Sequence, residues 1–179
     1  EKDGGVAVVY FSGRQPGNIL SRSLMESLAD ALGLLERDAS VRCVVLTGTP
    51  TVFCAGWDVT EFEGTAVLDP VRNAYLACWD RVGRLAKPLV AVVGGPAFGP
   101  GFELVLACDL VTAGESALFG FDHLDFGVIP GAGGTQRLAR ALGRHRSLDL
   151  LLTGRRLNGL EAVEAGLVSH VWPDEVLMR

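Results

Sequence analysis

The residues of this chain best suited to chemistry are a carboxylate and an imidazole that follow a glycine-rich segment. Glu103 ends the segment 94–103, whose sequence is GGPAFGPGFE, and His123 lies twenty residues further on. Carboxylate and imidazole groups both transfer protons in enzymes, and a histidine does so near neutral pH. We therefore treat Glu103 and His123 as the candidate acid–base residues.

The elements around Glu103 are those that position backbone amides. The apolar run 89–93 is short and bounded by breakers, which predicts a buried strand. Four glycines and two prolines follow within eight residues and predict a turn, and residues 102–108 then predict a short helix with Glu103 in its first turn. A strand, a glycine-rich turn and a helix start direct several N–H groups to one point. That arrangement suits an anion or a developing oxyanion.

Strands and helices alternate with short connections along the rest of the chain. Strands are expected at residues 5–11, 41–46, 109–113, 117–119 and 168–171. Helices are expected from the capping box at 23–26 to residue 35, from Asp69-Pro70 to residue 85, and at 135–142, 147–152 and 158–166. The alternation predicts an α/β fold in which residues 1–179 form a single domain, with largely parallel strands covered by helices.

Composition excludes several classes of function. The 179 residues are 49% hydrophobic and 21% charged, which is typical of a globular protein, and the net charge of −5 argues against nucleic acid as the main partner. No apolar stretch reaches eighteen residues, so we expect no membrane span, and the first residues show no signal-peptide pattern. The four cysteines are widely spaced without a metal-binding motif, so we expect no metal and a reducing, cytoplasmic location.

Five passages, taken together, resemble the crotonase family, also called the enoyl-CoA hydratase/isomerase superfamily. They are 41–48 (VRCVVLTG), 53–58 (FCAGWD), 96–109 (PAFGPGFELVLACD), 119–137 (FGFDHLDFGVIPGAGGTQR) and 152–168 (LTGRRLNGLEAVEAGLV). The resemblance implies a spiral of repeated ββα units. The helical C-terminal module of that family is expected to lie outside these 179 residues. It also implies assembly as a homotrimer or hexamer.

The resemblance implies an acyl-CoA substrate whose thioester carbonyl is held by two backbone N–H groups. No separate cofactor is implied, since coenzyme A is part of the substrate. The first donor matches the N–H of Trp57, but the second falls on Pro100, which has no N–H. Either Gly101 donates instead or the oxyanion hole is half-built, and one such donor is worth about 2.7–4 kcal/mol in the transition state.

The same two loops supply the residues that we expect to line the substrate path. These are Ala55, Gly56, Asp58, Phe98, Gly99 and Pro100. The loop 14–18 resembles a segment that helps to hold coenzyme A, with Arg14 as a candidate phosphate contact.

The acid–base positions match the family only in part. Glu103 matches the first of two catalytic glutamates, whereas His123 occupies the position of the second. A histidine there resembles a branch that cleaves carbon–carbon bonds in cyclic β-diketones without coenzyme A. The carboxylate that orients the histidine in that branch falls on Ala132 here, so Asp122 and Asp125 are the alternatives.

Three functions are therefore consistent with the sequence. The first is an enoyl-CoA hydratase or isomerase that uses Glu103 and His123 as acid and base. The second is hydrolytic C–C cleavage of a β-diketone in which His123 activates water. The third is a catalytically silent module that binds coenzyme A.

Overall fold

Two β-sheets form the centre of the computed structural model, which describes residues 1–13, 16–62 and 75–178. The larger sheet has the strand order β1-β2-β3-β4-β6-β9 and the smaller one the order β5-β7-β8. The strands of the larger sheet are β1 (Lys2–Asp3), β2 (Val6–Tyr10), β3 (Cys43–Thr47), β4 (Leu89–Val93), β6 (Leu110–Gly114) and β9 (His170–Trp172). The strands of the smaller sheet are β5 (Pro96–Phe98), β7 (Leu118–Gly120) and β8 (Leu157–Asn158).

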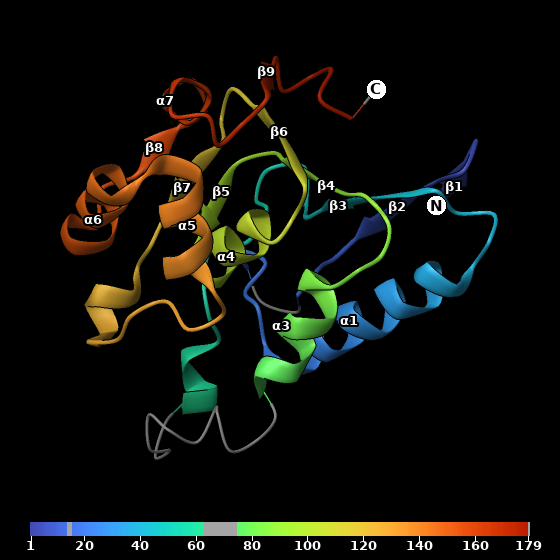
Figure 1. Ribbon diagram of the computed structural model, residues 1–179, viewed down its shortest axis with the longest axis horizontal. Helices are drawn as coiled ribbons and strands as arrows, with labels where there is room; N and C mark the ends of the chain where they lie inside the picture. The colour runs from blue at the N-terminus through green and yellow to red at the C-terminus, as the bar shows by residue number, and fades with distance from the viewer. Residues whose placement is uncertain (14–15, 63–74, 179) are drawn as a thin grey trace.

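Helices cover these sheets in two groups (Figure 1). α1 and α3 lie side by side near β2, β3 and β4, whereas α5, α6 and α7 lie toward β7 and β8. The helices are α1 (Arg22–Arg37), α3 (Tyr75–Gly83), α4 (Pro100–Leu106), α5 (Gly134–Leu142), α6 (Arg144–Thr153) and α7 (Gly159–Glu164), with the 3₁₀ turns η1 (Val59–Phe62) and η2 (His123–Phe126). Within the described residues, no helix is both long and apolar enough to cross a membrane.

The chain passes repeatedly from the larger sheet to the smaller one and then into a helix. β4 is followed by β5 and α4, and β6 is followed by β7, η2 and α5. The isolated bridge between Cys54 and Ala97 joins the passage after β3 to the smaller sheet in the same way. These ββα turns are the crotonase-type spiral expected from the sequence, and the α/β prediction is confirmed.

The central strand β4 shows why a buried strand of this sheet can be predicted from the sequence. It pairs in parallel with β3 and with β6, with Ala91 opposite both Leu46 and Val111. A strand with neighbours on both sides and covered faces is apolar throughout, and four of its five residues are buried. Parallel pairing also holds for β2–β3 and β6–β9, whereas β1–β2 and β7–β8 are antiparallel.

Two local expectations were wrong at element boundaries. The cap of α1 is Ser21, whose side chain accepts a hydrogen bond from the N–H of Leu24, and Ser23 lies inside the helix. The turn expected after residue 93 contains the strand β5, and α4 starts at Pro100, two residues early. Proline is favoured in the first helical turn because no intrahelical partner is lost there. The expected helix start at Asp69-Pro70 and the candidate contact Arg14 lie outside the described residues.

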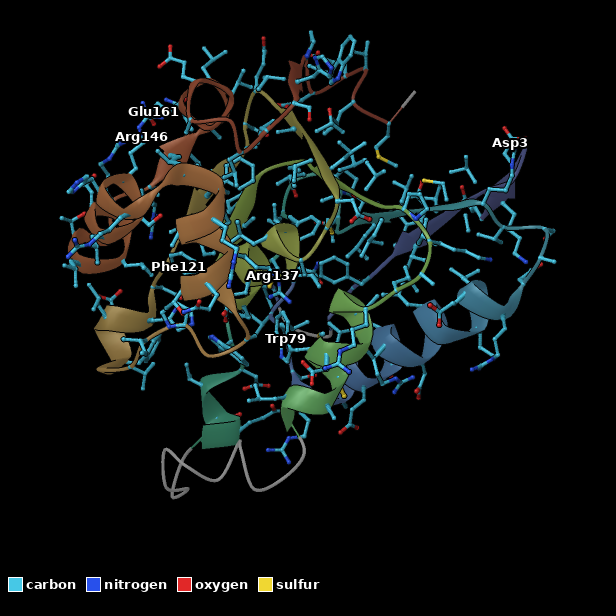
Figure 2. The ribbon with its side chains drawn as sticks, viewed as in Figure 1. Asp3, Trp79, Phe121, Arg137, Arg146 and Glu161 are labelled. Atoms are coloured by element: carbon cyan, nitrogen blue, oxygen red, sulfur yellow. The ribbon has the colours of Figure 1, made fainter. Side chains whose placement is uncertain are left out.

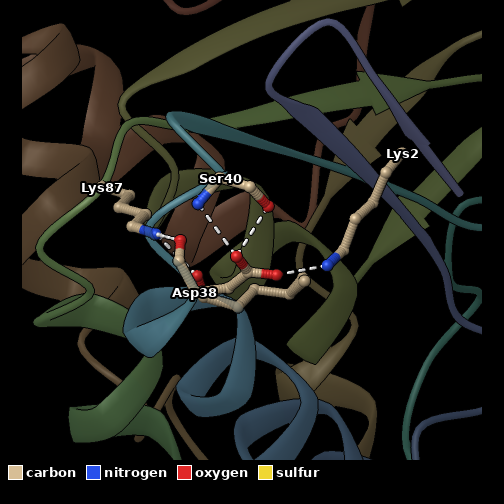
Figure 3. Close-up of polar contacts among 5 residues, drawn as sticks. Lys2, Asp38, Ser40 and Lys87 are labelled. Atoms are coloured by element: carbon tan, nitrogen blue, oxygen red, sulfur yellow. Dashed lines mark hydrogen bonds and ion pairs between the residues drawn. The ribbon is translucent and has the colours of Figure 1, made fainter.

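A polar cluster holds the end of α1 against β1 and the segment before β4 (Figure 3). The carboxylate of Asp38 pairs with Lys2 and accepts hydrogen bonds from the N–H and hydroxyl of Ser40, at 2.9 Å and 2.6 Å. Lys87 Nζ donates to the backbone oxygens of Leu35 and Asp38, at 2.7 Å and 2.6 Å. The cluster therefore satisfies carbonyl groups that a helix end leaves without partners.

Replacing Asp38 with asparagine is expected to lower the melting temperature at pH 7 but not in acid. The bonds from Lys2 and then Ser40 hold the pKa of Asp38 well below its ordinary value. A carboxylate with a lowered pKa stabilises the fold above its unfolded pKa of about 3.9, and that stabilisation disappears as the pH falls through the folded value. The difference in melting temperature between wild type and Asp38→Asn should therefore shrink below about pH 4. An unchanged difference down to acid pH would contradict the assignment, and the exposed Asp3→Asn is the control.

Candidate active site

Glu103 is fixed in the interior by the second glycine-rich loop. It lies in the first turn of α4, as expected, and is 0% exposed. Its Oε1 atom accepts hydrogen bonds from the N–H groups of Ala132 and Gly134, both at 2.8 Å. A Cβ atom added to Gly134 would lie 2.7 Å from that oxygen, so glycine is required for this approach. The loop 129–134 therefore holds Glu103 and leaves its other oxygen, Oε2, for chemistry.

His123 faces Glu103 across the site. It begins the turn η2 and is 3% exposed, and its Nε2 atom lies 3.6 Å from Oε2 of Glu103. Neither of these two atoms has a hydrogen-bond partner among the described residues. A separation of 3.6 Å is too long for a hydrogen bond but allows one small molecule to contact both groups. The structure thus brings together the two residues that the sequence singles out.

Asp122, rather than Asp125, is the carboxylate beside His123. Its Oδ1 atom lies 3.9 Å from Nδ1 of the imidazole, whereas Asp125 is exposed. Burial is the main cause that raises the pKa of Asp122 above its ordinary value. The sequence could not choose between the two because Asp122 directly precedes the 3₁₀ turn η2 and Asp125 lies within it, where neither strand nor helix periodicity fixes the side-chain direction.

Aromatic rings pack around the imidazole. Trp57 and Phe121 approach His123 edge-on, with centroids 6.3 Å and 5.5 Å away, and Trp79 lies 6.3 Å from Trp57. Phe121 and Trp79 are 5% and 2% exposed, and Figure 2 shows both in the interior of the molecule. The rings limit access of water to the acid–base pair. Neither Phe121 nor Trp79 was singled out from the sequence, since a single buried aromatic carries no distinctive pattern.

The amide of Trp57 is directed away from the N-terminal segment. The carbonyl of Gly56 accepts a hydrogen bond from Leu20 N–H at 2.9 Å. In a trans peptide unit the following N–H points the opposite way, so Trp57 N–H is directed away from Leu20. In the same segment, the carbonyl of Cys54 accepts a hydrogen bond from Phe98 N–H at 2.8 Å. The two loops named by the sequence are thus neighbours.

The second expected donor, Gly101, is packed against the interior. A Cβ atom added to it would lie 2.6 Å from Cys54 Cβ and 2.6 Å from Cys54 O. Burial raises the pKa of the Cys54 thiol to about 11, and the amides of Gly56, Leu20 and Gly101 oppose that rise. The Gly101 amide therefore lies close enough to influence the thiol. Pro100, buried at the first position of α4, contributes no N–H.

The remaining expected site residues have structural contacts in these loops. Ala55 N–H donates to Gly17 O at 2.9 Å, and Oδ1 of Asp58 accepts from the N–H and hydroxyl of Thr60 at 3.2 Å and 2.6 Å. The guanidinium of Arg156 lies 4.1 Å from the centre of the Phe98 ring. The contribution of Ala55, Asp58 and Phe98 to substrate binding stays a prediction.

At position 99 both the backbone conformation and the surrounding space require glycine. Its φ angle is +53°, and an added Cβ would lie 2.2 Å from Oδ1 of Asp122.

Nowhere in residues 1–13, 16–62 and 75–178 do three His, Cys, Asp or Glu side chains gather in a way that could hold a metal ion. Glu103 and His123 are both groups that can transfer protons.

Comparisons with known proteins agree with this geometry. A model of the enoyl-CoA hydratase/isomerase family matches residues 1–179. A probable mitochondrial enoyl-CoA hydratase of Dictyostelium discoideum is 41% identical over 99% of this chain and 64% of its own length. A probable enoyl-CoA hydratase of Rhizobium meliloti is 40% identical over 99% of this chain and 69% of its own length.

Solved structures show the same likeness. The crystal structure of an enoyl-CoA hydratase from Bacillus anthracis has a TM-score of 0.88 and 40% identity, with 97% of this chain and 68% of that chain covered. A Geobacillus kaustophilus enoyl-CoA hydratase subunit gives a TM-score of 0.95 at 38% identity, with 99% and 69% covered. This chain therefore spans roughly two thirds of the length of such relatives, from 64% to 69% for those named here. With its ββα spiral and a family match from end to end, the chain belongs to the enoyl-CoA hydratase/isomerase family of the crotonase superfamily.

Proposed function

We propose that this protein adds water to, or shifts the double bond of, an α,β-unsaturated acyl-CoA thioester. The observation that carries the proposal is the buried pair Glu103 Oε2 and His123 Nε2, which face each other at 3.6 Å. No other acid or base is needed to move two protons at one site. The curated relatives that support it include a 2,3-dehydroadipyl-CoA hydratase from Escherichia coli, 37% identical over 90% of this chain and 64% of its own length.

Hydration would use the pair as base and acid in turn. A water molecule that hydrogen-bonds to both Oε2 and Nε2 attacks the β-carbon, and a new C–O bond forms as one water proton passes to the base. The electron pair of the double bond moves to the α-carbon and its carbonyl, and the α-carbon then takes a proton from the acid. The two amides on Oε1 of Glu103 leave Oε2 as the oxygen that accepts or returns the proton.

The negative charge that develops on the thioester oxygen needs donors. We assign one to the N–H of Trp57, which is directed away from Leu20. Gly101 stays the proposed second donor, although its close packing on Cys54 favours the half-built alternative. One missing donor reduces kcat by about 10²–10³ in enzymes that stabilise an oxyanion.

The wider properties of the protein are proposed with the function. We expect an acyl-CoA substrate without a further cofactor, a single core domain over residues 1–179 and a cytoplasmic location. Assembly as a homotrimer or hexamer is supported by apolar side chains on the surface, among them Ile129, Leu152 and Leu160, which are 74%, 69% and 68% exposed.

The direct test is turnover of a panel of enoyl-CoA thioesters by the purified protein. Loss of the ultraviolet absorbance of the conjugated thioester measures hydration, and the product is identified by mass. Binding of acyl-CoA without any turnover across the panel would support a catalytically silent module and contradict the proposal.

One observation favours a second candidate, hydrolytic C–C cleavage of a β-diketone. His123 lies beside a carboxylate at 3.9 Å, an arrangement that can activate water for attack on a carbonyl. A cyclic β-diketone without coenzyme A, tested in the same way, separates the candidates. Turnover of the diketone but not of enoyl-CoA, lost in His123→Ala, would replace the first proposal by the second.

A further inference from the structure

Four buried polar atoms at or directly beside His123 lack hydrogen-bond partners in the described part of the chain. They are Nδ1 and Nε2 of His123 itself, Oδ1 of Asp122 and Oε2 of Glu103. Unpaired buried polar groups are rare and costly, so several in one place indicate a functional arrangement. Nε2 is explained by its position opposite Glu103, at 3.6 Å. Nδ1 of His123 and Oδ1 of Asp122 lie 3.9 Å apart. The acid–base pair of Glu103 and His123 does not explain why these two atoms lack partners.

We propose that Asp122 is a positioning residue whose carboxylate holds the Nδ1 proton of His123, so that the lone pair of Nε2 faces Glu103. The inference rests on the proposed function, in which Nε2 exchanges protons with substrate. Which nitrogen of a histidine is protonated is set by the hydrogen bond that the other one makes. A small torsion of either side chain brings the 3.9 Å separation within hydrogen-bond range.

The two glycine loops keep the Asp122 carboxylate in place. A Cβ atom added to Gly99 would lie 2.2 Å from Oδ1, and one added to Gly56 would lie 3.0 Å from Oδ2. Any larger residue at Gly99 would displace the carboxylate. The Asp122 side chain is only 20% exposed, so it stays beside the imidazole instead of turning into solvent. The loops that flank the amide of Trp57 thus also determine the position of Asp122.

Several titratable groups surround Asp122 and His123. The groups that act on Asp122 are His123, Asp125, Arg156 and the Cys54 thiol, and those nearest the imidazole are Asp122 and Glu103. Burial raises the pKa of Asp122, while a positive charge on His123 opposes that rise. The carboxylate and a protonated imidazole therefore stabilise each other. A carboxylate beside Nδ1 determines which nitrogen of the imidazole carries the proton.

The test compares Asp122→Asn with Asp125→Asn, a matched control in which a nearby exposed carboxylate is changed in the same way. The first readout is the ¹⁵N NMR spectrum of the His123 imidazole in the protein without substrate. In wild type at high pH, Nδ1 of His123 should be protonated and Nε2 unprotonated. Asp122→Asn should lose that preference for the Nδ1 tautomer, because the anion that holds the Nδ1 proton is gone. Asp125→Asn should leave the tautomer unchanged.

The second readout is kcat and KM, measured separately, for the enoyl-CoA that wild type hydrates. Asp122→Asn should lower kcat about 10–100-fold with little change in KM. Asp122→Ser, which removes the charge in a smaller side chain, is the second variant if asparagine disturbs folding.

Each outcome decides the inference. Retention of the wild-type tautomer in Asp122→Asn overturns it, as does an equal effect of Asp125→Asn. If wild type turns over no enoyl-CoA, the proposed function fails, yet the NMR arm still tests the Asp122–His123 contact.

Discussion

Glu103→Gln is expected to reduce kcat on the preferred enoyl-CoA by about 10²–10⁴-fold, with KM within a few-fold of wild type. The glutamine oxygen can still accept the N–H groups of Ala132 and Gly134, so the loop that holds the side chain stays in place. The amide nitrogen then faces His123 where Oε2 stood, and an amide takes up no proton at neutral pH. Steady-state kinetics and a thermal melt measure the two consequences separately.

The control for this change is Glu115→Gln, an exposed carboxylate just after β6. It should leave kcat unchanged. A Glu103→Gln protein within tenfold of wild type would show that Glu103 only fixes the loop, and the acid–base mechanism would then depend on His123 alone.

Pro100→Ala is expected to raise kcat, by at least about tenfold and up to the 10²–10³ that one oxyanion donor contributes. Pro100 is the first residue of α4, where an N–H has no intrahelical partner and points out of the helix start. Alanine supplies that missing amide beside the loop of Trp57. We expect a loss of unfolding free energy below about 1 kcal/mol, because proline restricts the unfolded chain.

The matched control is Pro173→Ala, which changes an exposed proline distant in sequence from Pro100. It should change neither activity nor mechanism. Unchanged kcat in a well-folded Pro100→Ala protein would mean that a second donor is already present. Gly101 would then be the candidate, despite its packing on Cys54.

Local sequence determined most of the elements, since their signals depend on near neighbours. The apolar run 89–93 gave the central strand, and the capping box of Asn158 and Glu161 correctly marked the start of α7. Glu103 was placed in a first helical turn by the proline and glycines before it. The strand β5 was missed because its flanking glycines and its own Pro96 suggested a turn, and parallel pairing with β7 overrides that preference.

The contacts among the candidate site residues could be seen only in the tertiary structure. The sequence named Glu103 and His123, and the resemblance to a family related them, but their 3.6 Å separation comes from the packing of α4 against η2 and α5. That Asp122 rather than Asp125 faces the imidazole, and that the amides of 132 and 134 hold Glu103, also follows from folding. The physical reason is that these atoms are separated by up to 31 residues along the chain. Periodicity reports which side of its own element a residue lies on, whereas contacts between elements depend on how the whole core packs.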